Sequence, residues 1–259
     1  MNEKLWTKKY LFSLLLVFGV NMGYVLLNSV MAIYGTVLTS SSVIGGYMIT
    51  AFTIAALVAR VFIKKLNEKF NNKTLLISGL VLTVIAAAGY CKAGEIISFI
   101  LFRILHGFGF GISLTCATAI SNEYVPASRL SEGVGFTSSA NTIANAISPT
   151  IALQILGQDY SNFLTLFIVL FVISMTILTL SFLLKNNNQL ATANKKQQSY
   201  REIIIASVFF LGTLSQGDVN SFLTSFARIL DLGNIGLFFT ITAIVTFFPD
   251  FSLVKCKTG

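Results

Sequence analysis

About eight apolar stretches run along the 259 residues of this chain, and the positive charge of the links between them alternates. Each stretch is about 17–25 residues long, which is the length that a helix needs to cross roughly 30 Å of hydrocarbon. Links after an even number of stretches carry Lys and Arg, whereas links after an odd number are nearly empty of them. Because cytoplasmic loops retain positive charge, this pattern predicts a multi-pass membrane protein with a cytoplasmic N-terminus.

The composition supports a bilayer environment. Hydrophobic residues make up 54% of the chain and charged residues 11%, whereas an ordinary soluble domain has roughly 25% charged residues. Closely spaced spans must be helices, because lipid offers no hydrogen-bond partner to backbone amides. The net charge of +8 would suggest nucleic acid in a soluble protein. Here the positive charge lies mainly in alternate links between the spans. We therefore predict an all-α integral membrane protein that contacts the lipid bilayer and no nucleic acid.

The order of spans and links predicts the domain organisation. The expected spans cover residues 10–34, 44–63, 74–90, 95–119, 133–156, 162–184, 203–226 and 233–248. Residues 185–201 form a polar stretch without apolar periodicity, which is typical of a flexible cytoplasmic linker. We therefore divide the chain into a six-span unit at 1–184, a linker at 185–201, two further spans at 202–248 and a tail at 249–259.

An internal similarity suggests that the last two spans begin a second copy of the first unit. Residues 52–58 (FTIAALV) in the second span align with residues 239–245 (FTITAIV) in the eighth. Transporters with parallel repeats show such internal similarity. Because the tail replaces the basic connector that a full repeat would have, we expect a truncated or fragmentary chain. The alternative is a genuine eight-span protein.

Two ionisable residues lie deep within predicted spans. Arg103 is about seven residues into the fourth span, roughly 10 Å from its outer boundary. A guanidinium at this depth is costly unless it faces a cavity or an interhelical partner, or unless the side chain reaches back to the outer interface. Asp218 lies at a similar depth in the seventh span. Its carboxyl group either exchanges protons or serves as a structural hydrogen-bonding acid.

The single histidine, His106, lies three residues after Arg103 and shares its side of the helix. An intramembrane histidine can relay protons, and a structural role is equally compatible with the neighbouring Gly107. The sequence contains no nucleophile–base arrangement, no phosphate-binding loop and no metal-ligand spacing. We therefore predict no enzyme activity, no cofactor and no metal site, since an enzymatic interpretation would rest on His106 alone.

The fifth predicted span is unusually polar. Its polar side chains recur at three- and four-residue steps and so share one helical face; they are Ser138, Asn141, Asn145 and Ser148. Such a face either lines a water-filled path or hydrogen-bonds to neighbouring helices. Pro149 follows directly and predicts a bend or a loosened turn.

Small and polar residues mark two other spans. Asn21 and Asn28, two turns apart in the first span, form a weaker polar stripe. Gly107 and Gly111 in the fourth span have the spacing that lets two helix backbones approach closely. We interpret the two glycines as a helix-packing site.

Three segments around the fourth span carry a family resemblance. They are residues 101–111 (LFRILHGFGFG), 122–129 (NEYVPASR) and 132–135 (EGVG). Together they resemble the major facilitator superfamily, particularly its bacterial drug-efflux-like members. An arginine followed by glycines in the fourth span is a recognised motif of that family. The resemblance implies a role for Arg103 in proton coupling or in cavity electrostatics.

Two further family motifs are present with departures. The connector after the second span has Lys64 and Asn71 where the family has glycines, but its charged residues are similar; they are Arg60, Lys65, Glu68 (in place of the usual Asp), Lys69 and Lys73. The exporter motif of the fifth span keeps its proline in Ser148-Pro149 but loses both of its glycines. These departures put gating and antiport activity in doubt and leave the family resemblance intact.

The resemblance implies a fold of twelve spans in two six-span halves around a central cavity. This chain would supply the complete N-terminal half and about two helices of the second. The first, fourth and seventh spans line the cavity in that fold, which matches the positions of Asn21, Arg103 and Asp218. The implied function is a secondary transporter of the cell membrane, which exports a small molecule by proton antiport and alternating access. The alternative is a non-transporting fragment.

Overall fold

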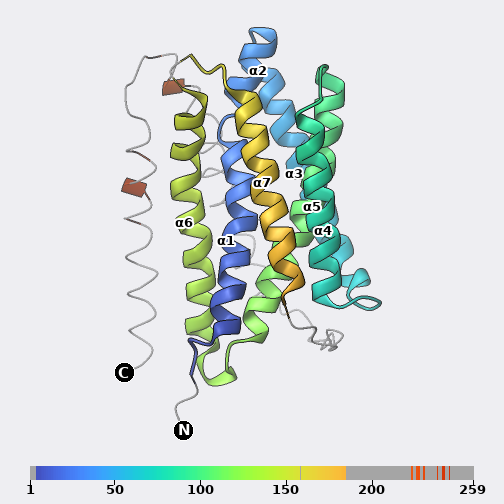
Figure 1. The fold of residues 1–259 in the computed structure, drawn as a ribbon, viewed down its shortest axis with the longest axis vertical. Helices are drawn as coiled ribbons and strands as arrows, with labels where there is room; N and C mark the ends of the chain where they lie inside the picture. The colour runs from blue at the N-terminus through green and yellow to red at the C-terminus, as the bar shows by residue number, and fades with distance from the viewer. Residues whose placement is uncertain are drawn as a thin grey trace, which may run out of the picture.

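The described part of the molecule is a bundle of helices. The computed structural model describes residues 4–157 and 159–184 and a few single positions between 223 and 245. Figure 1 shows the long helices side by side along one axis, with the start of α1 at the lower end of the bundle. The predicted linker, the tail and Asp218 lie outside the described residues, as do the last two predicted spans apart from the single positions.

Seven α-helices and one short 3-10 helix follow one another in the described residues. They are α1 (Lys8–Asn28), α2 (Met31–Thr39), α3 (Ser42–Leu66), α4 (Asn72–Tyr90), α5 (Ile96–Glu123), η1 (Ala127–Arg129), α6 (Leu130–Leu156) and α7 (Phe163–Phe182). The described residues contain no strand. Side-chain caps start several of the helices: Thr7 accepts a hydrogen bond from the Tyr10 amide, and Asn71 accepts one from the Thr74 amide.

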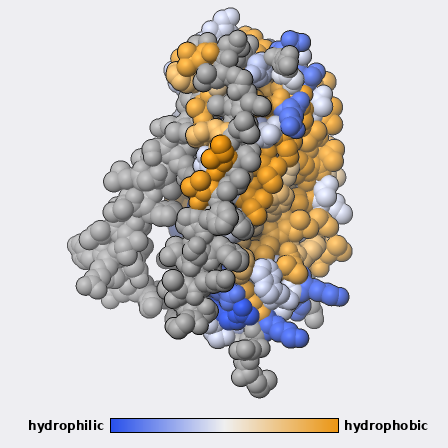
Figure 2. Space-filling view, turned by 90° about the vertical axis from the view of Figure 1, so that its left-hand side faces the viewer, coloured by the Kyte–Doolittle hydropathy of each residue, from blue (hydrophilic) through white to orange (hydrophobic). Residues whose placement is uncertain are grey.

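Length and composition make most of these helices fit to cross a membrane. Five segments qualify: Lys8–Thr39, Val43–Ile63, Asn72–Tyr90, Ile96–Glu123 and Phe163–Phe182. Figure 2 shows a broad apolar band on the visible described surface, with hydrophilic residues gathered at both ends of the bundle. Helix α6 has 27 residues and is about 40 Å long, but its polar face keeps it out of this set. The prediction of an all-helical membrane protein is confirmed.

The first span differs from the prediction at its outer end. Its helix is interrupted at Ser29 and Val30 and then continues as α2 to Thr39, five residues beyond the predicted end at Tyr34. Gly35 lies just past that predicted end and does not form a turn. A Cβ atom added there would clash with the backbone of Gly45 in α3. The glycine therefore allows α2 and α3 to approach closely, and the link between them shrinks to Ser40 and Ser41.

Helix α5 lies at the centre of the bundle and packs most extensively against α3 and α4. Added Cβ atoms at Gly107 and Gly111 would clash with the carbonyl oxygens of Phe52 and of Ala56 in α3. On its other side, Gly109 faces Gly79 of α4 equally closely. These small residues bring three backbones together. Helix α6 instead packs mainly against α1.

Candidate functional site

Arg103 is held entirely inside the bundle. Its side chain, which comes from α5, is 0% exposed. Nε donates a hydrogen bond to the Met48 carbonyl at 3.1 Å, and Nη2 donates one to Asn28 Oδ1 at 2.8 Å. The guanidinium carbon lies 4.5 Å from the ring centroid of Phe52, which is within range of a cation–π interaction. The side chain thus joins α1, α3 and α5 and does not reach the outer surface.

The partners of Arg103 are all neutral. The only ion pair among the described residues joins Arg129 and Glu132, so no described carboxylate compensates the guanidinium. Its Nη1 atom is buried and makes no hydrogen bond to any described residue. An uncompensated buried cation is costly. The site therefore keeps a positive charge and spare donor capacity in the middle of three packed helices.

His106 lies one turn further along α5, beside the Arg103 cluster. It is 1% exposed, and its Nδ1 atom lies 3.1 Å from the hydroxyl oxygen of Tyr90 in α4. The imidazole and the Phe52 ring form a T-shaped pair, with a centroid distance of 5.1 Å and an interplanar angle of 86°. Phe52 thus contacts both Arg103 and His106, which makes it the common neighbour of the two polar side chains.

Three aromatic rings from three helices extend this contact toward the other end of the bundle. Tyr24 of α1 stacks on Phe52 of α3 at 4.9 Å and on Phe110 of α5 at 4.4 Å. Beyond them, the guanidinium carbon of the exposed Arg60 lies 6.0 Å from the Phe110 centroid. The aromatic cluster therefore has a buried arginine at one side and an exposed arginine at the other.

The polar face of α6 meets α1 through amide side chains. Asn21 Nδ2 donates to Asn145 Oδ1 at 2.9 Å and to the Asn141 carbonyl at 3.2 Å. Asn145 and Ser138 are exposed nevertheless, and Asn141 Oδ1 is buried without a hydrogen-bond partner among the described residues. The face therefore bonds to a neighbouring helix and leaves other polar side chains exposed.

Pro149 lies within α6, and the helix continues past it to Leu156. Because proline has no amide hydrogen, the carbonyl of Asn145 lacks its usual helical donor. The residue before the proline, Ser148, donates its hydroxyl hydrogen to the Ala144 carbonyl at 2.6 Å. Both Ser148 and Pro149 are buried against the neighbouring helices.

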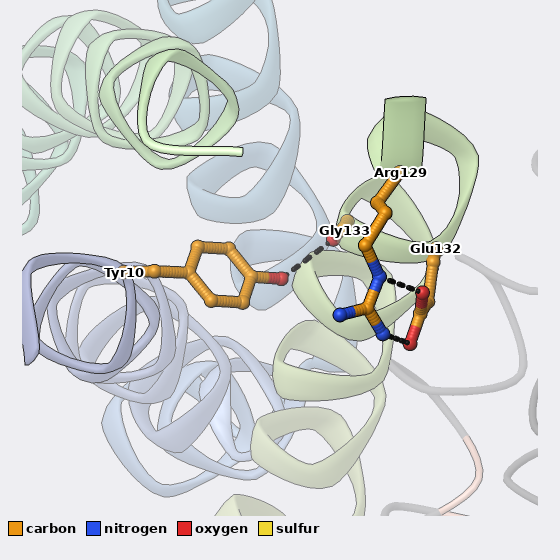
Figure 3. A network of polar contacts seen from close by, with 4 residues as sticks. All are labelled: Tyr10, Arg129, Glu132 and Gly133. Atoms are coloured by element: carbon orange, nitrogen blue, oxygen red, sulfur yellow. Dashed lines mark hydrogen bonds and ion pairs between the residues drawn. The ribbon is translucent and has the colours of Figure 1, made fainter. Parts of the chain in front are cut away.

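At the lower end of the bundle, the start of α6 is tied to the start of α1. Tyr10 donates its hydroxyl hydrogen to the Gly133 carbonyl at 2.7 Å (Figure 3). Beside it, Arg129 forms a two-point ion pair with Glu132, with distances of 2.8 Å and 2.7 Å. The carboxylate in the first turn of α6 also suits the positive end of the helix dipole.

The connector residues divide into exposed and bonded groups. Arg60, Lys65, Glu68 and Lys69 are exposed. Lys73 instead donates to the carbonyls of Phe182 and Leu184 at the end of α7. Its neighbour Asn72 donates to Glu123 Oε1 at the end of α5, with a distance of 2.7 Å. The connector thus joins the ends of three helices at this end of the bundle.

Sequence reasoning missed two residues of this region. Tyr90 and Phe52 hold His106 and Arg103, yet aromatic residues in apolar spans carry no local signal of such a role. Asn28 was placed in one stripe with Asn21, whereas the structure gives each a partner on a different helix. The described residues contain no cluster of His, Cys, Asp and Glu that could hold a metal ion.

The chain was also compared with known proteins. A family model described as Major Facilitator Superfamily matches residues 13–253, which is most of the chain. No curated protein matches the chain.

Proposed function

The chain belongs to the major facilitator superfamily, whose members are membrane transporters, and we propose that it is a proton-coupled exporter of a small, largely apolar molecule. In this proposal it lies in the cell membrane and works by alternating access, in which two helical halves move around a site between them. The substrate leaves in exchange for protons.

The helices of the structure supply the N-terminal half in this proposal. The pair α1 and α2 forms the first span, α3 to α5 form the next three, and α6 and α7 form the last two. Residues 202–248 would begin the second half, after the linker at 185–201. The lysines of the connector and of the N-terminal segment support a cytoplasmic position for the lower end of the bundle, because cytoplasmic segments retain positive charge.

One observation carries the proposal: Arg103 is a fully buried cation whose described partners are all neutral. A purely structural side chain at this position would pack better without a charge, since replacing buried ionic groups by apolar ones is often neutral or stabilising. We propose that the charge is retained to interact with protonatable groups during the transport cycle. Asp218 is the candidate acid, because it is the other ionisable residue deep within a predicted span.

Transport by the purified chain in proteoliposomes tests the proposal. A pH-sensitive dye inside the vesicles reports proton movement when a panel of small apolar compounds is added outside. We expect at least one compound to drive saturable proton exchange with the unmodified chain. Arg103→Ala should abolish this exchange, and Arg103→Lys should not restore it, because a lysine cannot reproduce the forked contacts to Asn28 and Met48.

Lys92→Ala is the matched control, since Lys92 is an exposed cation between α4 and α5. This variant should transport normally. If Arg103→Ala transports as well as Lys92→Ala, Arg103 has no role in coupling. If no compound moves protons with the unmodified chain, the antiport proposal fails.

A further inference from the structure

A small cavity lies beside His106, and its lining residues come from α1, α4, α5 and α7. It has room for about one water molecule. Its polar lining comes from Tyr24, Thr83, His106 and Ser174, and the glycines Gly19 and Gly23 of α1 provide part of its wall. A space of this size stays dry when it is apolar and holds water when several polar groups face it.

The contacts of Tyr90 favour one tautomer of His106. The Tyr90 hydroxyl lies 3.3 Å from the Phe102 carbonyl and 3.1 Å from His106 Nδ1. A carbonyl can only accept, and tyrosine has a single hydroxyl hydrogen. Both contacts are satisfied when Tyr90 donates to Phe102 and Nδ1–H donates to Tyr90. The ring then carries its hydrogen on Nδ1, and its Nε2 atom is left as an acceptor.

Two hydroxyl groups in the lining of the cavity can hydrogen-bond to a water molecule. Ser174 of α7 is 5% exposed, and its side chain has no hydrogen-bond partner among the described residues. Thr83 of α4 donates to the Gly79 carbonyl at 3.1 Å, which leaves its oxygen free to accept. Together with Nε2, they provide the three polar partners that a buried water typically has.

We propose that the cavity binds one ordered water molecule, which donates a hydrogen bond to His106 Nε2 and connects α5 with α4 and α7. The single histidine is thereby a neutral Nδ1–H imidazole that is bonded on both sides. His106 orients this water. The water site does not depend on the transport cycle proposed above, so failure of either proposal leaves the other standing.

Nitrogen NMR of the complete chain tests this assignment at a single residue. Because the chain has one histidine, protein labelled with ¹⁵N-histidine and purified with a tag that lacks histidine gives signals from His106 alone. In lipid nanodiscs at neutral pH, we expect Nδ1 to show a directly bonded hydrogen and Nε2 to show none. Transfer of magnetisation from water should reach Nε2. A hydrogen on Nε2, or contact of Nε2 with aliphatic protons only, would overturn the proposal.

Three variants test the tautomer of His106 and the bound water separately. Tyr90→Phe removes the acceptor of Nδ1–H, so the Nε2–H form should appear. Ser174→Ala removes one partner of the water and should weaken the water signal at Nε2. Gly23→Ala fills part of the cavity at little steric cost, since the added Cβ would lie 3.4 Å from Leu170 Cδ1.

Gly23→Ala should therefore abolish the water signal while the Nδ1–H form persists. Ser181→Ala is the control, because Ser181 lies two turns from Ser174 on α7 and bonds to the Leu178 carbonyl. This variant should change neither signal. A water signal that survives Gly23→Ala would show that the water is bound elsewhere.

Discussion

Helices α5 and α6 both carry polar side chains at helical spacing, but they expose them very differently. On α5, Arg103 and His106 are 0% and 1% exposed, and glycines allow the helix to pack closely against α3 and α4. On α6, Asn145 and Ser138 remain exposed, and the helix packs mainly against α1. The same kind of sequence pattern thus produces a sealed polar core on one helix and a partly open face on the other.

The difference shows that the neighbours of a polar stripe, more than its composition, decide what it does. Arg103 cannot exchange partners without movement of α1 or α3, because its described contacts come from backbone and side chains of both helices. Asn145 has one described partner, Asn21, and can bond to another group on its exposed side. We therefore infer that α5 carries the fixed charge of the described bundle, and that α6 provides its adaptable polar surface.

The largest expected difference between the two helices is their reactivity toward water-soluble reagents. Single cysteines are introduced at Asn145 on α6 and at Ser113 on α5 in a background without Cys91, Cys116 and Cys256. Asn145→Cys should react readily with a membrane-impermeant maleimide, because thiolate formation needs water. Ser113→Cys should stay unlabelled, since Ser113 is 0% exposed.

Mass spectrometry of the protein in nanodiscs measures both variants, and full labelling of denatured samples provides the control. Equal protection of the two cysteines would mean that the exposed face of α6 is covered by lipid. The contrast between a sealed and an open stripe would then disappear.

A smaller effect is expected for the free energy of unfolding. Asn28→Ala leaves Nη2 of the buried Arg103 without a hydrogen-bond acceptor, which should cost about 2 kcal/mol. Asn145→Ala should cost less than about 1 kcal/mol, because Asn21 keeps its bond to the Asn141 carbonyl. Thermal unfolding of the two variants in the same detergent measures the difference. If Asn145→Ala lowers the midpoint as much as Asn28→Ala, α6 is held as firmly as α5.

The sequence predicted the helices well because hydropathy and length depend on local composition. All six spans expected in residues 1–184 overlap helices of the structure. The interruption at Ser29 and Val30 had no such signal, since an apolar run continues through it. The partners of the polar residues also escaped prediction: Tyr90 faces His106, and Asn28 faces Arg103, only because α1 and α4 pack on either side of α5. Spacing identifies a face of a helix, whereas its partners depend on tertiary packing.

The smallest expected effect concerns the end of α6 that is tied down. Tyr10 is 0% exposed and donates to the Gly133 carbonyl at 2.7 Å. Tyr10→Phe should cost about 1 kcal/mol of unfolding free energy, because the same carbonyl keeps a second donor, the Thr137 hydroxyl at 3.1 Å. Arg129→Gln, the neighbouring control, should cost less than about 0.5 kcal/mol, since its ion pair with Glu132 is partly exposed. Hydrogen–deuterium exchange should rise in the first turns of α6 in Tyr10→Phe and stay unchanged around Asn145. Faster exchange along the whole of α6 would show instead that this single hydrogen bond holds the entire open face in place.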